Sequence, residues 1–181
     1  MYLGLDLSLS ATGYAVIAEN GQLITSGIIK PKKIKTKDDI DGLKRGLYIK
    51  DELVSILNEH ELLHKIKHCA IESVFAGRNI AVTKKLCYLN SLFRELCMAF
   101  SIDYSIINPL ELKAYISFPE KAKRKDKEMI STKVKNKYGI ICDDDNEADA
   151  YVLARMNRDF HTKKYLRNTK EFLKGFISLE V

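Results

Sequence analysis

The sequence predicts an α/β fold in which a mixed five-stranded sheet carries helices on both faces. Three short strand-like runs open the chain, and two further strand-like runs each follow a long helical pattern. The remaining periodic segments are helical. At 181 residues the chain is long enough to bury one sizeable core, so a single domain accounts for these elements.

The first three predicted strands cover residues 2–6, 13–17 and 23–29. The first is a short apolar run that ends in an acid, and a polar turn of serines and a threonine separates it from the second. Gly21 supplies the turn before the third strand. Such short connections join antiparallel neighbours, so the chain opens with an antiparallel meander.

The middle of the chain alternates helices and strands. An amphipathic pattern predicts a helix over residues 39–60, a strand then ends at Glu72, and residues 104–107 form the next strand. The helix between these two strands has apolar residues at alternating spacings of four and three: Val82, Leu86, Leu89, Phe93, Leu96 and Phe100. That stripe predicts either a core-facing side or a dimer interface.

The last third of the chain is predicted to be helical. Pro109 begins a short helix that ends at Tyr115, residues 117–125 form a basic loop, and residues 126–138 form a further helix. The alanines and aliphatic residues around Asp149 predict a helix that packs on the sheet. Three strands, helix, strand, helix, strand and then helices is the element order of the RNase H-like fold.

Acidic residues that are far apart in the sequence lie at the ends of predicted elements. Asp6 and Glu72 end adjacent strands, where a buried carboxylate costs several kcal/mol unless it is paired or bound to a cation. Asp149 lies on a helix with Asp145 and Asn146 four and three residues before it, on the same face. Mg²⁺ and Mn²⁺ prefer such oxygen ligands. The simpler interpretation gives each acid a separate structural role, as a turn cap, a lysine partner or a solvated charge.

Three motifs resemble those of the RuvC family of Holliday-junction resolvases and occur in the same order. They are Gly4-Leu-Asp6 with Thr12-Gly-Tyr14, then Ala70-Ile-Glu-Ser-Val-Phe75 with Arg78-Asn79, and finally Glu147-Ala-Asp-Ala150. The resemblance runs from Met1 to about Arg155 and implies a nuclease domain over residues 1–155, followed by a basic C-terminal extension over residues 156–181. A phage or viral version of the family is compatible with the small size.

The resemblance implies roles for individual residues. Asp6, Glu72 and Asp149 correspond to metal ligands for Mg²⁺ or Mn²⁺, with two ions per site. The fourth ligand of the family falls on Asn146, whose amide binds a hard cation more weakly than a carboxylate does, so Asp145 is an alternative ligand.

Further residues are implied to contact DNA. Phe75 corresponds to the aromatic that stacks beside unpaired junction bases, and Arg78 belongs to the same motif. Lys113 and Lys127 match lysines near the scissile phosphate, so Lys127 is also a catalytic candidate.

Positive charge is distributed unevenly along the chain. The net charge is +6, and residues 113–137 hold nine Lys or Arg residues against three acids. The centre of this segment contains four candidate DNA-binding residues: Lys121, Lys123, Arg124 and Lys125. Basic segments beside an acidic site attract phosphates that the acids alone would repel, although lysine-rich faces are often only solvated surface.

Composition restricts the setting of the protein. Neither a signal peptide nor an apolar window of 18 residues is evident, which predicts no membrane association and a cytoplasmic location in a prokaryotic or phage-infected host cell. The four cysteines lack paired spacing and suit reduced core thiols. His60, His64 and His68 are expected to be solvated near the end of a helix rather than to bind a transition metal.

The sequence therefore predicts a metal-dependent endonuclease that resolves branched DNA by paired symmetric nicks. Two nicks imply a homodimer, and no small-molecule cofactor is expected. One alternative is a non-catalytic junction-binding protein of the same fold, which Asn146 favours. Another is an actin-like ATP-binding phosphotransferase, because Asp6 and the hydroxyl residues after it resemble a phosphate-binding hairpin. The chain is too short for the two domains that such phosphotransferases need.

Overall fold

The computed structural model describes residues 1–32, 40–74, 79–118 and 130–162, which form a mixed five-stranded sheet and five α-helices. The strand order is β3-β2-β1-β4-β5. The strands are β1 (Tyr2–Asp6), β2 (Thr12–Ile17), β3 (Leu23–Ile29), β4 (His68–Glu72) and β5 (Asp103–Ile107). Strands β1 to β3 pair antiparallel, whereas β4 is parallel to both β1 and β5. The predicted fold class is confirmed.

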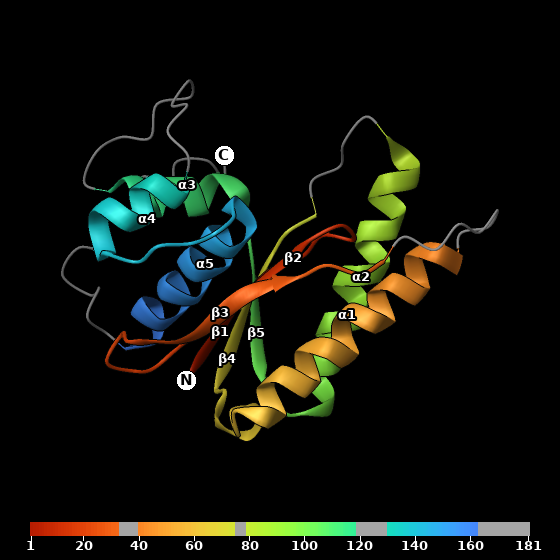
Figure 1. The fold of residues 1–181 in the computed structure, drawn as a ribbon, viewed down its shortest axis with the longest axis horizontal. Coiled ribbons are helices and arrows are strands. Elements are labelled where there is room, and N and C mark those ends of the chain that lie inside the picture. Colours follow the sequence, from red (N-terminus) through yellow and green to blue (C-terminus); the bar gives the residue numbers. More distant parts are fainter. Residues whose placement is uncertain (33–39, 75–78, 119–129, 163–181) are drawn as a thin grey trace, which may run out of the picture.

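Helices cover both faces of this sheet, as predicted. They are α1 (Ile40–Glu59), α2 (Ile80–Ala99), α3 (Pro109–Ser117), α4 (Ile130–Tyr138) and α5 (Asp145–His161), with a short 3₁₀ helix η1 (Leu63–Lys65) before β4. Figure 1 shows α1 and α2 on one side of the sheet and α5, with α3 and α4, on the other. The predicted start of the fourth helix at residue 126 lies outside the described residues. No described helix is long and apolar enough to span a membrane.

Capping residues define the beginnings of three helices. The Asn79 side chain accepts hydrogen bonds from the first turn of α2, and Asp144 does the same for α5. Asn108 and Glu111 form a capping box at α3, with Pro109 as its first residue. Each cap satisfies backbone N–H groups that have no partner inside the helix.

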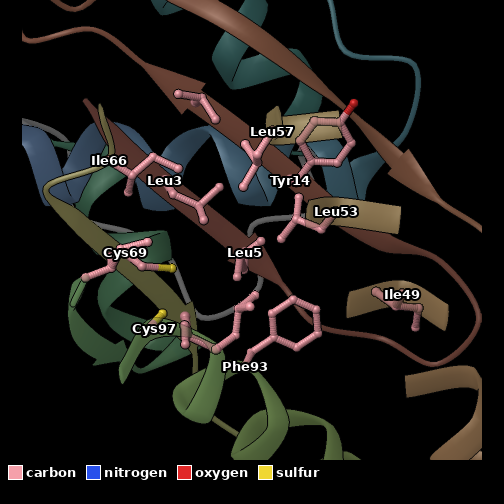
Figure 2. Close-up of a cluster of buried hydrophobic side chains, with 14 of the residues drawn as sticks. Leu3, Leu5, Tyr14, Ile49, Leu53, Leu57, Ile66, Cys69, Phe93 and Cys97 are labelled. Atoms are coloured by element: carbon pink, nitrogen blue, oxygen red, sulfur yellow. The ribbon is translucent and has the colours of Figure 1, made fainter. Parts of the chain in front are cut away.

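The alternation of side chains along β1 and β4 separates two hydrophobic clusters. Leu3, Leu5 and Cys69 belong to the cluster that packs against α1 and α2, and Figure 2 shows them beside residues of those helices. Tyr2 and Ala70 belong to the other cluster, which contains the apolar face of α5. Side chains two positions apart on a strand share a face. The last residues of both strands, Asp6 and Glu72, therefore face α5.

Helix α5 packs very closely against the backbone of β1 and β2. A Cβ atom added to Gly4 would stand 2.1 Å from the carbonyl oxygen of Ala150, and one added to Gly13 would stand 1.9 Å from that of Asn146. Only glycine permits such an approach. These two residues of the opening motif thus determine how deeply α5 sits above the strand ends.

The histidines differ in part from the prediction. His60 and His64 are exposed, but His68 begins β4 and is only 8% exposed. Its ring lies 4.2 Å, between centroids, from that of His161 at the end of α5. The expectation of a solvated residue is wrong for His68 because the strand starts at this position and directs its side chain toward α5.

Replacement of Gly4 by alanine is predicted to destabilise the fold by about 3 kcal/mol, because the new methyl group overlaps the backbone of α5. Thermal unfolding should show a loss of about 6–12 °C. Gly46→Ala, within α1, is the matched control, since its Cβ would meet the Leu89 side chain of α2 at an ordinary 3.4 Å. That change should stabilise by about 0.5–1 kcal/mol. Equal melting temperatures for the two variants would contradict the proposed close packing of α5.

Candidate metal centre

The sheet and α5 bring the three predicted metal ligands into one region. Asp6 and Glu72 follow directly after Leu5 and Ile71, which are paired in the parallel register of β1 and β4. Both strands run in the same direction, so both carboxylates lie at the same edge of the sheet. Asp149 is in the second turn of α5, the helix that this edge faces.

Asp6 is held largely away from water, at 7% exposure. Burial raises the pKa of its carboxyl group to about 9, helped by a hydrogen bond with Glu72 and by the negative charges of Glu72, Asp149 and Asp144. A hydrogen bond between two carboxyl groups requires a proton on one of them. Without a cation, Asp6 therefore keeps its proton near neutral pH and donates a hydrogen bond to the Glu72 side chain.

Asp149 is also strongly perturbed. Burial and the charges of Glu72 and Asp145 raise its pKa to about 7, while the positive charge of Lys113 acts in the opposite direction. Its Oδ1 atom is buried and has no hydrogen-bond partner among the described residues. Such an atom is costly unless something else, such as a cation, satisfies it.

The donor set fits a hard divalent cation. Within the described ranges no group of three or more acidic, histidine or cysteine side chains is arranged so that it could already hold a metal ion. The carboxylates instead relieve their repulsion through protonation. A divalent cation could replace that proton, because carboxylate oxygens are the ligands that Mg²⁺ and Mn²⁺ prefer and because metal binding releases protons from its ligands.

The first turn of α5 contains the predicted fourth ligand and its alternative. Asp145 Oδ1 accepts a hydrogen bond of 2.8 Å from Ser131 Oγ on α4, and its charge reaches Asp149. Asn146 lies one residue further, with its main-chain oxygen close to Gly13. Asp144 was not predicted, although its charge reaches Asp6; its side chain caps the helix through the Asn146 N–H at 2.9 Å.

The sequence also did not predict two buried polar residues, Glu147 and Asn90, that hold in place the elements carrying Asp149 and Glu72. Glu147, only 8% exposed, accepts hydrogen bonds from Ser26 Oγ at 2.6 Å and from the Asp143 N–H at 2.9 Å, which fastens the start of α5 to β3. Asn90 Nδ2 donates to the main-chain oxygen of Glu72 at 3.1 Å. The burial of Asn90 could have been inferred from the sequence, since it is a polar residue within the apolar stripe of its helix, but its partner could not.

The predicted DNA-binding residues fall in two groups. Lys113 is exposed on α3, and its charge reaches Asp149, so this lysine lies beside the acids. The others lie outside the described residues: Phe75, Arg78, Lys121, Lys123, Arg124, Lys125 and Lys127.

Comparison with known proteins supports one family. The family model described as "Crossover junction endodeoxyribonuclease RuvC" matches residues 2–155. No curated protein matches the chain. Similar solved structures include RuvC from Thermus thermophilus, with a TM-score of 0.68 and 15% identity over 89% of this chain and 95% of that one.

Two further solved structures extend the comparison. T. thermophilus RuvC in complex with a Holliday junction substrate has a TM-score of 0.67 and 14% identity over 89% of this chain and 96% of that one. The yeast mitochondrial Holliday junction resolvase Ydc2 has a TM-score of 0.58 and 18% identity over 94% and 83%. At these identities the structures establish the RNase H-like fold.

Asp6→Asn is predicted to stabilise the protein in the absence of metal. The pKa of Asp6 is higher in the folded protein than its ordinary value of 3.8, so wild-type stability falls as the pH rises from about 4 toward 9. The variant lacks this titration. Its melting temperature in EDTA should exceed that of the wild type by about 4–8 °C at pH 8, which corresponds to about 2 kcal/mol, and by much less at pH 4.

Asp51→Asn, on an exposed position of α1, changes the net charge equally and serves as the control. This control should show no comparable gain at pH 8. A difference between Asp6→Asn and wild type that does not vary with pH would contradict the raised pKa of Asp6.

Proposed function

The chain belongs to the RuvC family of crossover junction endodeoxyribonucleases, and from this premise we propose that Asp6, Glu72 and Asp149 are the metal ligands with which it resolves Holliday junctions. The observation that carries the proposal is the convergence of these acids, with the pKa of Asp6 at about 9 and that of Asp149 at about 7. Perturbed carboxylates at the edge of a sheet are typical of a functional site rather than of separate structural acids.

The proposed cofactor is Mg²⁺ or Mn²⁺, with two ions per site. When bound, such ions activate a water molecule and stabilise the oxygen that leaves the phosphodiester. Asp6 at the end of β1, Glu72 at the end of β4 and Asp149 on α5 would hold the ions, since Asp149 Oδ1 is buried and has no hydrogen-bond partner in the described part of the chain. Asn146 is proposed as the fourth ligand and Asp145 as its alternative, the latter because the charge of Asp145 reaches Asp149.

The protein's own residues are proposed to bind and orient the DNA backbone. Lys113 brings a positive charge close to Asp149, so it attracts a phosphate to a site that the acids would otherwise repel. The basic segment 119–129 joins α3 to α4. Both helices contact the acidic region, since the charge of Lys113 on α3 reaches Asp149 and Ser131 on α4 donates to Asp145. Its lysines and arginine are therefore proposed to bind the junction arms, with Lys127 near the scissile phosphate.

Selectivity for branched DNA is proposed to depend on Phe75. This residue follows Glu72 by three positions, so the chain cannot carry it far from the acids. Base stacking on an aromatic ring is worth about 1–3 kcal/mol per base and is available where bases are already unpaired. Arg78, in the same motif, is proposed to contact the backbone beside it.

A homodimer is proposed because two symmetric nicks require two sites related by a twofold axis. The nuclease domain is proposed to cover residues 1–155, although α5 continues to His161, and residues 156–181 to form a basic extension. Junction resolution in the cytoplasm of a prokaryotic or phage-infected cell remains the proposed setting.

Asp6→Asn, Glu72→Gln and Asp149→Asn are each predicted to lower the single-turnover rate on a synthetic four-way junction at least about 1,000-fold, because each removes a metal ligand. Junction affinity, measured by fluorescence anisotropy, should stay equal or increase because phosphate repulsion decreases. Asp51→Asn is the charge-matched control and should cleave like wild type. Full metal-dependent nicking by any of the three variants would refute the proposed ligand set.

A further inference from the structure

We propose that Asn90 on α2 is a positioning residue for Glu72, and that Arg94 fixes the orientation of the Asn90 side-chain amide. The proposal rests on the role of Glu72 as a metal ligand given above. Asn90 holds the backbone of Glu72 from the face of the sheet that α2 covers, while the side chain of Glu72 projects toward α5 on the opposite face.

The end of β4 needs such support because its ladder finishes there. Glu72 is the last residue of β4 and pairs with Ile107, and the Ser73 N–H donates to the Ile107 carbonyl at 2.8 Å. On the other side the register with β1 ends one residue earlier, at Ile71. The main-chain oxygen of Glu72 instead accepts its hydrogen bond from Asn90 Nδ2 at 3.1 Å.

Arg94 determines which end of the Asn90 amide faces the strand. Arg94 Nε donates to Asn90 Oδ1 at 2.7 Å. Because a guanidinium group can only donate, the amide oxygen must face Arg94 and the amino group must face Glu72. One amide therefore connects an arginine on the next turn of α2 to the end of β4.

Asn90 lies on a part of α2 that is packed firmly against the sheet. It is only 3% exposed and lies next to Leu89, while Phe93 and Leu96 on the same helix are buried in the cluster that packs on the sheet. An apolar residue would suit this position better if packing were its only task, since a buried amide costs free energy unless both of its ends are bonded. Both ends are bonded here.

The hydrogen bond from Asn90 to the main-chain oxygen of Glu72 can affect metal binding by the Glu72 carboxylate. Glu72 must keep its carboxyl group beside that of Asp6, to which it is hydrogen-bonded in the metal-free protein. A residue at the end of a strand can rotate about its backbone unless the carbonyl is anchored, and such rotation would move the carboxylate away. Partners behind metal ligands typically change metal affinity by about 10–100-fold when they are removed.

The test compares Mn²⁺ binding by isothermal titration calorimetry in full-length protein without DNA. Asn90→Leu removes both bonds at similar volume, and Arg94→Met keeps the amide but frees its orientation. The expected result is Mn²⁺ binding about tenfold weaker for Asn90→Leu and about threefold weaker for Arg94→Met. The Mn²⁺ concentration for half-maximal cleavage should rise by the same factors, with junction affinity unchanged.

Leu96→Ala is the control for stability alone, because it removes a buried side chain of the same helix away from the carbonyl of Glu72. It should lower the melting temperature and leave Mn²⁺ affinity as in wild type. Equal losses of Mn²⁺ affinity in this control and in Asn90→Leu would overturn the positioning role.

The outcomes separate this inference from the proposed function. If Glu72→Gln loses Mn²⁺ binding while Asn90→Leu binds within twofold of wild type, the positioning role is overturned and the ligand assignment stands. If Glu72→Gln itself keeps Mn²⁺ binding and cleavage, the proposed function fails. Should Asn90→Leu not fold, Arg94→Met decides, and unchanged Mn²⁺ binding in that variant overturns the inference.

Discussion

The packing of α5 against the bare backbone of β1 and β2 brings Asp149 to the strand ends that carry Asp6 and Glu72. Gly4 and Gly13 permit this contact because any side chain there would overlap carbonyl groups of α5. Glu147 fastens the first turn of the helix to β3. The depth of one helix above the sheet thus determines whether carboxylates from three separate elements meet.

The close approach of Asp6, Glu72 and Asp149 costs free energy, and this cost indicates a functional role for the three acids. Burial and neighbouring carboxylates raise the pKa values of Asp6 and Asp149, and among the described residues Asp149 Oδ1 has no hydrogen-bond partner. A fold selected for stability alone would not collect such groups. In the proposed site a divalent cation would convert this repulsion into ligation, so the arrangement that weakens the metal-free protein would favour phosphodiester chemistry.

Sequence patterns were sufficient for the architecture and for the elements on which Asp6, Glu72 and Asp149 lie. Strand alternation and helical periodicity are local signals, and the acids were conspicuous because they interrupt apolar runs at strand ends. The supporting residues were not predictable in the same way. Asn90 depends on a carbonyl far away in the sequence, and the charge of Asp144 reaches Asp6 only because α5 begins at the strand ends. His68 was assigned to solvent because no local pattern showed that β4 begins there.

Anomalous X-ray scattering from crystals grown with Mn²⁺ would locate the ions independently of activity. The proposed centre predicts anomalous peaks bounded by the carboxylates of Asp6, Glu72 and Asp149, with the hydrogen bond between Asp6 and Glu72 replaced by metal ligation. The same peaks should vanish in Asp149→Asn crystals. Peaks elsewhere in the protein, or peaks at these carboxylates that persist unchanged in the variant, would contradict a metal centre built from the three acids.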